Sequence, residues 1–159
     1  MNAVRVASVA WRRPRPRRHG KVTVNIEPKP PTTKGPAATF TGDVYIDAIA
    51  SPHDADQRMV VVRVRFAPGA RTAWHSHARG QTLHVTEGVA LLGTREGGVI
   101  RARPGDTIYT PPGQEHWHGA TPQDFMEHLA MLENGDDPAS TTTWLEHVTD
   151  SQYGNSAQA

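Results

Sequence analysis

Two histidines separated by a single residue, His75 and His77, constrain the chain more than any other feature. The residues around them favour an extended strand, in which alternate side chains point to the same face, so both rings project to one side. Gln81 follows four residues after the second histidine, beyond the short loop Ala78–Gly80. Such a pair is often no more than two surface or core residues, so a functional site requires a further group elsewhere in the chain.

The further group lies in residues 105–116, which read GDTIYTPPGQEH. A glycine turn opens a strand, a Pro-Pro-Gly turn closes it, and a histidine follows within three residues of that turn. Together the two segments supply three imidazoles and one amide oxygen, a ligand set suited to a divalent transition metal that keeps open coordination positions. The predicted metal ligands are His75, His77, Gln81 and His116.

Both segments resemble the two sequence motifs of the cupin family. The first motif sets a glycine, a His-x-His pair, an acidic residue and a second glycine at fixed intervals, in register with Gly69, His75, His77, Gln81 and Gly88. The second sets a glycine, Pro-x-Gly and a histidine, matched by Gly105, Pro111, Gly113 and His116. This chain departs from the first motif at Gln81, where most cupins carry glutamate. The resemblance implies an all-β fold, a single jelly-roll barrel of the cupin type.

A closer resemblance, over most of the chain after Lys34, is to the manganese-dependent hydroxynitrile lyases among the small bacterial cupins. It is carried by KGPAATFTGDVYID, FAPGARTAWHSHARGQTL, PPGQEHWHGATP, MEHLA and WLEHVTDSQY. The resemblance implies Mn²⁺ as the metal, although ligand chemistry alone also permits Fe²⁺, Ni²⁺ or Zn²⁺. It further implies that Val62 and Val64 are pocket walls, that Leu132 lies beside the cavity, and that His128 is the base.

Strand parity assigns faces to the apolar residues. Residues 59–66 alternate valines and a phenylalanine with arginines, so we expect the even-numbered residues of this strand to line the barrel interior. Core filling alone would also explain Val62 and Val64. In residues 126–132, the shared face carries Met126, Ala130 and Leu132 together with His128.

Parity also separates the histidines outside the predicted ligand set. His118 shares the face of His116, which makes it a candidate partner of the metal site or an acid–base group. His128 shares an apolar face, where an unpaired imidazole is costly, so it requires a polar partner or a substrate hydroxyl. We expect His84 to face outward, His53 to be solvated in a polar loop, and His147 to be structural.

The ligand set also predicts chemistry. Three imidazoles and a carboxamide are neutral, so the cation keeps its full double charge and favours anions such as an alkoxide or cyanide. A glutamine cannot act as a base, which counts against oxygenases that use the glutamate of other cupins. Cleavage of a cyanohydrin fits better, with His128 taking the hydroxyl proton and His118 assisting.

Two alternatives stay open at this stage. One is a metal-dependent dioxygenase or isomerase of small aromatic or carbonyl compounds, and the other is a non-catalytic cupin that binds a small ligand. Arg79, beside the predicted cavity, is either an attractor of an acidic substrate or a solvated loop residue. In each case the predicted partner is a small molecule.

Length and composition limit the architecture. The 159 residues suit one domain, and the 13 prolines and 14 glycines in short segments favour many turns. There is no cysteine, so disulfides and thiol catalysis are excluded. No apolar run approaches the ~18 residues of a membrane span. We predict a leader over residues 1–34, a cupin domain over residues 35–153 and a tail over residues 154–159.

Charge is unevenly distributed along the chain. Seven of the 17 Lys and Arg residues lie in residues 1–21, which contain no acidic residue. We interpret this basic, proline-rich leader as disordered rather than as a nucleic-acid-binding segment. It lacks the pattern of a secretory signal because Arg5 interrupts its apolar stretch, and we predict a cytoplasmic protein. We also predict a homodimer or homotetramer, because symmetric association is common and cupins often pair through an edge strand.

Overall fold

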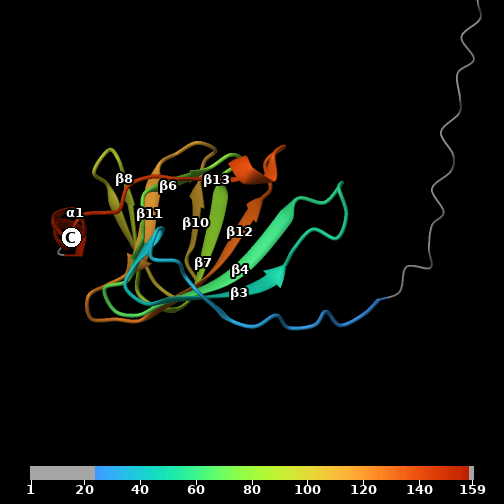
Figure 1. Cartoon of the computed structure of the whole chain (residues 1–159). Coiled ribbons are helices and arrows are strands. Elements are labelled where there is room, and N and C mark those ends of the chain that lie inside the picture. Colours follow the sequence, from blue (N-terminus) through green and yellow to red (C-terminus); the bar gives the residue numbers. More distant parts are fainter. Residues whose placement is uncertain (1–23, 158–159) are drawn as a thin grey trace, which may run out of the picture.

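The computed structural model describes residues 24–157, which form two curled antiparallel β-sheets (Figure 1). The first sheet has six strands in the order β1-β3-β4-β12-β7-β10. Their bounds are Thr33–Lys34 (β1), Val44–Ala50 (β3), Met59–Phe66 (β4), Met126–Glu133 (β12), Gln81–Gly88 (β7) and Thr107–Thr110 (β10). Residues 1–23 and 158–159 lie outside the described part of the chain, so most of the predicted leader does too.

The second sheet carries three of the four predicted metal ligands, His75, His77 and His116. Its main path runs β13-β6-β11-β5-β2, and β8 pairs with both β11 and β9. The bounds are Thr142–Trp144 (β13), His75–His77 (β6), His116–Ala120 (β11), Arg71–Thr72 (β5), Phe40–Thr41 (β2), Ala90–Thr94 (β8) and Val99–Ala102 (β9). A short 3₁₀ helix, Pro138–Ser140, precedes β13.

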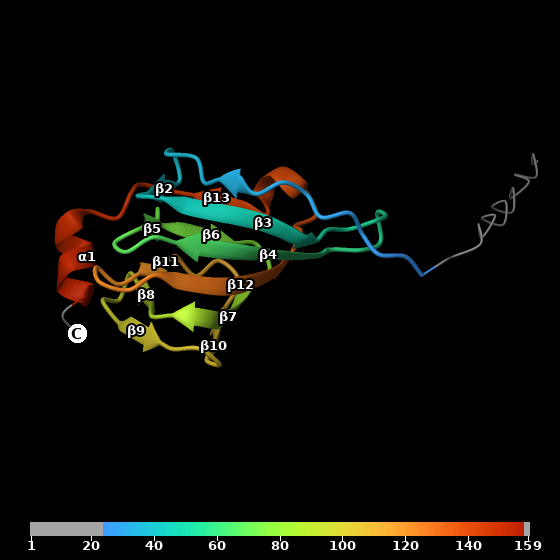
Figure 2. The same cartoon turned by 90° about the horizontal axis from the view of Figure 1, so that it is seen from below.

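The prediction of an all-β barrel of the cupin type is confirmed, and Figure 2 shows the two sheets curling around one interior. The parity assigned to β4 is also confirmed, because Val64 and Phe66 are buried in the core. In β7, the alternate residues Gln81, Leu83 and Val85 are buried, as period-two geometry requires. The two sheets therefore present their buried side chains to a shared interior.

The main apolar cluster fills the part of the interior between β2, β3, β4, β7 and β12. Two phenylalanines and three valines account for half of it, and small alanines fill most of the rest. Its buried members are Phe40, Val44, Val64, Phe66, Ala70, Val85, Ala90, Ala102, Ala120 and Met126. A smaller group, Leu83, Leu92 and Ala130, adjoins it. These residues give the interior an apolar wall.

A carboxyl-terminal helix, α1 (Asp150–Ala157), closes one end of the barrel (Figure 2). Thr149 and Gln152 form a reciprocal capping box, because each side chain hydrogen-bonds the other residue's backbone N–H, at 3.2 and 2.9 Å. Tyr153 of the helix donates its hydroxyl to the carbonyl of Ala120 at 2.8 Å. The predicted boundary after Tyr153 thus falls inside a helix that the sequence reading did not identify.

The predicted start of the domain at residue 35 lies directly after β1, whose residues pair with β3. Just before it, Thr32 donates its hydroxyl to Asp47 at 2.5 Å.

No helix in residues 24–157 is long and apolar enough to span a membrane.

Candidate metal centre

The four predicted metal ligands come from three strands and are brought together in the interior. His75 and His77 are the first and last residues of β6, and His116, the first residue of β11, pairs with His75. Gln81 opens β7. All four are buried, with at most 5% of any of them exposed. The expectation that both histidines of β6 project to the same side is confirmed.

A glycine makes the tight connection between β6 and β7 possible. Gly80 has a φ of +78°, a conformation that side chains with a Cβ rarely adopt. A Cβ at this position would also lie 2.7 Å from the carbonyl oxygen of Thr110. The turn can therefore bring Gln81 back beside His77 only because residue 80 has no side chain.

Two of the imidazoles are oriented by the backbone. Nδ1 of His75 hydrogen-bonds the carbonyl of Ala73 at 3.0 Å, and Nδ1 of His116 hydrogen-bonds the carbonyl of Gln114 at the same distance. A carbonyl only accepts, so each Nδ1 carries the proton and each Nε2 keeps its lone pair. This arrangement is the one that metal-binding histidines commonly use.

The third imidazole is oriented by a side chain. Nδ1 of His77 lies 3.0 Å from the hydroxyl of Thr142, while its buried Nε2 has no hydrogen-bond partner. Nε2 of His116 lies 3.1 Å from Oε1 of Gln81. Two atoms at this separation can both lie about 2.1 Å from one ion. The orphaned nitrogen and the converging lone pairs fit a bound cation.

A second grouping of histidines overlaps the predicted one. The ligand nitrogens of His75, His116 and His118 all lie within 4.8 Å of one another and could hold a metal ion. The ring of His75 lies 4.3 Å from that of His116 and 5.1 Å from that of His77, measured between centroids. The interior therefore offers four imidazoles around one place, of which His118 is the one expected to act in acid–base chemistry.

His118 and His128 form a buried pair beside this cluster. Nε2 of His128 lies 3.2 Å from Nδ1 of His118, so the two rings share a hydrogen bond. The pairing of β12 with β7 shifts register next to His128, an irregularity that re-aims side chains. Phe66 contacts both rings, at centroid distances of 5.8 and 5.6 Å. One nitrogen of His128 thus has a polar partner, whereas its buried Nδ1 has none.

Burial keeps these imidazoles neutral. Burial lowers the pKa of His77 and of His128 to about 4. It also holds the pKa of His75 and of His118 well below the ordinary value, and neighbouring histidines add to the effect. The pKa of His116 is lowered for the same reason. Neutral imidazoles are the form that binds a metal or accepts a proton.

The three residues predicted to line the substrate pocket lie along β4 and β12. Val64 pairs with His128, and Leu132 pairs with Gln81 on β7. Val62 pairs with Ala130 between these two points and packs against the core. The three side chains therefore extend from the predicted base to a predicted ligand, and their role as pocket walls stays a prediction.

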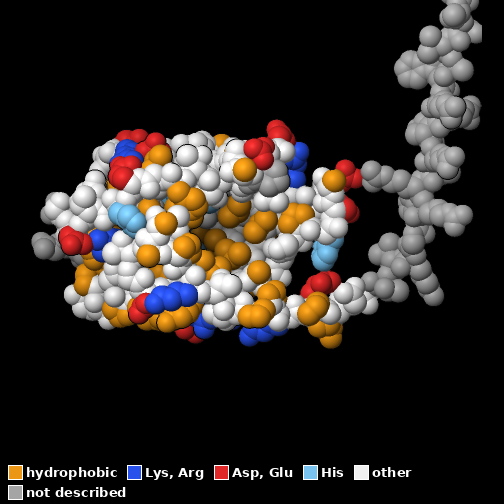
Figure 3. All heavy atoms as spheres, viewed as in Figure 1, with side chains coloured by type: hydrophobic (Ala, Val, Ile, Leu, Met, Phe, Trp, Pro, Cys, Tyr) orange, Lys and Arg blue, Asp and Glu red, His pale blue; other side chains and the backbone are white. Residues whose placement is uncertain are grey.

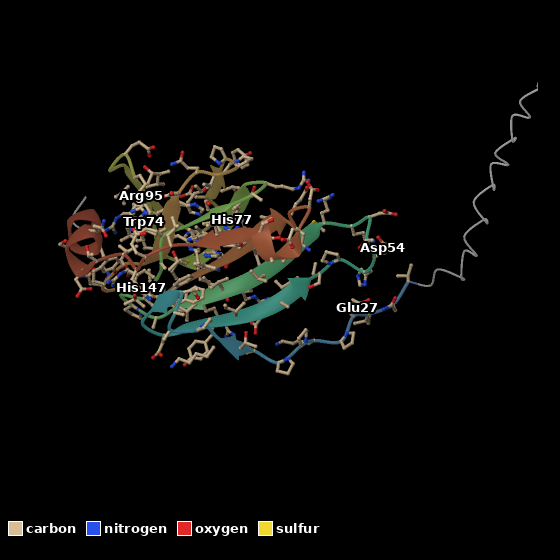
Figure 4. The ribbon with its side chains drawn as sticks, turned by 45° about the horizontal axis from the view of Figure 1, so that its top comes forward. Glu27, Asp54, Trp74, His77, Arg95 and His147 are labelled. Carbon is tan, nitrogen blue, oxygen red and sulfur yellow. The ribbon has the colours of Figure 1, made fainter. Side chains whose placement is uncertain are left out.

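The remaining histidines of the described chain lie outside the cluster, as expected. His84 faces outward and hydrogen-bonds Thr107 at 2.9 Å. His53 lies exposed in the loop between β3 and β4, and exposed His147 hydrogen-bonds Thr41 at 3.2 Å. Figure 4 shows His147 and His77 far apart, from different parts of the fold.

Arg79 does not face the cluster as a free charge. It pairs with Asp136 at 2.9 Å, and Asp136 also pairs with Arg58 at 2.9 Å. These residues are partly exposed, so the pairing fixes a surface loop rather than a substrate carboxylate.

Two residues near the cluster were not singled out by the sequence reading. Thr142 contacts Nδ1 of His77, and the indole of Trp144 lies 4.7 Å from the ring of His75. Both belong to β13, which pairs with β6 through Thr142 opposite His77 and Trp144 opposite His75. Their sequence distance from the motifs concealed them, although Trp144 opens one of the segments shared with the lyases.

Figure 3 shows apolar side chains gathered around a hollow in the face seen in Figure 1. A cleft of about 460 Å³ elsewhere is lined by Trp74, Arg95 and Trp117 and contains none of the predicted site residues. Figure 4 shows Trp74 and Arg95 together at one end of the barrel, with His77 nearer its middle. A smaller cleft, of about 260 Å³, is lined by Gln81 and Leu132 among others.

The comparisons with known proteins agree with this geometry. The cupin domain family matches residues 62–130. A (R)-mandelonitrile lyase from Granulicella tundricola is 48% identical over 120 residues, which are 76% of this chain and 89% of that protein. The chain belongs to the cupin family. The matched family region of this cupin contains all four predicted ligands and His128, but it ends before β13.

Solved structures share the fold of this cupin. A cupin-like protein from Thermotoga maritima superposes with a TM-score of 0.74 and 31% identity, covering 86% of this chain and 99% of that one. The polyketide cyclase RemF from Streptomyces resistomycificus has a TM-score of 0.55 and 20% identity over 69% of this chain and 75% of its own. The second likeness concerns the fold alone.

Proposed function

We propose that this cupin is a metal-dependent hydroxynitrile lyase, which cleaves a cyanohydrin into a carbonyl compound and hydrogen cyanide and catalyses the reverse addition. The observation that carries the proposal is a neutral ligand cluster beside a buried histidine pair, in a chain 48% identical to a (R)-mandelonitrile lyase. The family alone does not specify a reaction, because one fold supports many chemistries.

His75, His77, Gln81 and His116 are the residues that would hold the metal, for which we propose Mn²⁺. Nε2 of His116 lies 3.1 Å from the amide oxygen of Gln81, the rings of His75 and His77 adjoin them, and Thr142 and two backbone carbonyls orient the rings. When bound, a divalent cation with neutral ligands supplies an undiminished positive charge that stabilises an alkoxide or cyanide.

The histidine pair supplies the proton chemistry. The imidazole of His128 takes the hydroxyl proton of the cyanohydrin, and the electron pair of the C–C bond leaves with cyanide as the carbonyl forms. The same imidazole then returns the proton to cyanide, which gives hydrogen cyanide. His118, whose Nδ1 lies 3.2 Å from Nε2 of His128, hydrogen-bonds this ring and stabilises the imidazolium that forms in between.

The apolar surroundings support this proton transfer. His128 is 1% exposed, and Val64, Phe66 and Val85 lie around it on the same face. Burial lowers the pKa of His128 to about 4, so the imidazole is unprotonated at neutral pH and ready to accept a proton. Exclusion of water from such a position also protects the proton from exchange with solvent.

The proposal is tested by adding mandelonitrile to protein loaded with Mn²⁺ and measuring benzaldehyde. We expect benzaldehyde to form at a rate far above that of His128→Ala, while His84→Ala, on the outer face of the neighbouring strand, behaves as the wild type. Benzaldehyde formation no faster than in His128→Ala would refute the lyase, and metal-dependent oxygen uptake in its place would favour an oxygenase.

The metal is tested separately by elemental analysis of protein purified without added metal. We expect about one equivalent of a divalent transition metal, lost in Gln81→Ala and retained in Thr82→Ala. Retention of the metal in Gln81→Ala, or its loss in His118→Ala alone, would replace the proposed ligand set with the overlapping histidine group.

A further inference from the structure

Trp144 occupies an unusual place between a predicted ligand and the solvent. It is the last residue of β13 and pairs directly with His75. Directly paired residues of neighbouring strands project to the same face of a sheet, so the indole lies on the side of the imidazole. The two rings are 4.7 Å apart between centroids and inclined by 33°. One face of the indole is thus held against the cluster.

The rest of the indole is open. Trp144 is 40% exposed, although a large aromatic side chain gains most when it is fully buried. Its neighbour Phe40, at a centroid distance of 5.7 Å, is only 8% exposed. A partly exposed apolar surface next to a polar site is a common feature of ligand-binding positions.

Aromatic rings continue from Trp144 to the histidine pair. Phe40 lies 6.3 Å from Phe66, and Phe66 lies 5.8 Å from His118. His118 in turn lies 5.2 Å from His75, which closes the circuit. A continuous series of ring contacts therefore joins the predicted ligand His75 to the predicted proton-transfer pair. Trp144 is the most exposed ring in this series.

We propose that Trp144 is the aryl-binding residue of this cupin, holding the aromatic substituent of the substrate against its indole while the hydroxyl is directed to the interior. This inference rests on the proposed function and assigns to Trp144 the preference for aromatic over aliphatic cyanohydrins.

The physical basis is the interaction between aromatic faces and edges. Offset or edge-on contacts between rings stabilise a pair by about 0.5–1.5 kcal/mol beyond the apolar area that they bury, which corresponds to about 2- to 10-fold in affinity. An aliphatic group gains only the contribution from the apolar area that it buries. Selectivity for aryl compounds is consequently the property that Trp144 controls, whereas the bond-breaking step belongs to the interior.

Binding without turnover gives the first test. Protein loaded with Zn²⁺, which is diamagnetic, is titrated with benzyl alcohol and with 2-methyl-1-propanol, and binding is followed by saturation-transfer NMR. We expect Trp144→Leu to weaken benzyl alcohol about 3- to 10-fold and leave the aliphatic alcohol unchanged. Trp144→Phe retains most of the binding. Tyr109→Leu, which removes an aromatic ring that is 64% exposed on β10, changes neither.

Kinetics give the second test, with mandelonitrile and acetone cyanohydrin as substrates. We expect Trp144→Leu to raise KM for mandelonitrile about 3- to 10-fold, with kcat and the acetone cyanohydrin reaction nearly unchanged. Equal losses on both substrates, or loss of bound metal, would assign Trp144 a structural role and overturn the inference. If Trp144→Leu does not fold, Trp144→Met, which also lacks an aromatic ring, decides through the same comparison of substrates.

The two proposals fail in different ways. Absence of lyase turnover together with Trp144-dependent binding of benzyl alcohol removes the lyase and keeps the aryl-binding residue. Turnover with unchanged aryl selectivity in Trp144→Leu keeps the lyase and removes the aryl-binding residue.

Discussion

The inner and outer faces of the β7–β12 pair each carry a histidine, but the two imidazoles lie in different environments. His128 on the inner face is buried against Phe66, and burial lowers its pKa to about 4. His84, on the outer face of the neighbouring strand, is partly exposed and hydrogen-bonds Thr107. Alternate residues of a strand face opposite sides of the sheet. Strand parity therefore places His128 in the interior and His84 at the surface.

The largest expected contrast between the two faces is in catalysis. His128→Ala removes the proposed base and should lower the rate of mandelonitrile cleavage about 100- to 10,000-fold, the range for loss of a general base. His84→Ala should stay within about twofold of the wild type, because its imidazole does not reach the interior. Measured turnover of both Mn²⁺-loaded variants checks the contrast, and equal losses would contradict it.

The next contrast is in stability. Leu83 is 2% exposed and packs against Leu92 and Ala130, so Leu83→Ala should lower the free energy of unfolding by about 2–5 kcal/mol. Thr82 faces outward one residue earlier, and Thr82→Ala should change it by about 0.5 kcal/mol or less. Urea denaturation of the metal-free proteins measures both, and similar midpoints would show that the inner face does not carry the core.

A smaller contrast tests β13 in the same way. Thr142→Val removes the hydroxyl that holds Nδ1 of His77 and should weaken metal binding about 10- to 100-fold. Thr143, which pairs with Ser76 between the two histidines, is exposed, and Thr143→Val should leave the affinity unchanged. Competition with a metal chelator measures both constants. An unchanged affinity in Thr142→Val would show that the hydroxyl does not fix the ring.

The smallest and most gradual contrast is in acid stability. The pKa of His128 is about 4 in the folded protein and near the ordinary 6.5 in the unfolded chain. Between these values the unfolded chain binds a proton that the folded protein does not, so stability is full above pH 6.5 and falls as pH drops toward 4. The slope from one such group is about 1 kcal/mol per pH unit.

We therefore expect His128→Asn to flatten the fall in thermal midpoint of the metal-free protein between pH 6.5 and pH 4. A steeper fall of the thermal midpoint in His128→Asn than in the wild type would contradict a lowered pKa of His128 in the folded protein.

Local spacing was sufficient to identify the motif residues and their faces. The interval between His75, His77 and Gln81 is a property of one strand and one turn, and the same holds for His116 and the turn before it. Strand parity then placed Leu83 and His128 inside and His84 outside, because period-two geometry does not depend on distant parts of the chain.

What escaped the sequence reading depends on pairings between distant segments. Thr142 reaches His77 across 65 residues, and Trp144 reaches His75 only because β13 pairs with β6. No spacing rule links these positions. Helix α1 was missed although Thr149 and Gln152 have the spacing of a capping box, since this short signal is not followed by a strongly apolar periodic segment.

The placement of β13 at the border of its sheet has one more consequence. The strand is three residues long, and β6 is its only neighbour in the order of the described strands. Any contact that draws β13 outward would release the ring of His77 and uncover that of His75 in a single displacement. Such a displacement would alter the proposed metal site from the border of the sheet, with every proposed ligand left in the sequence.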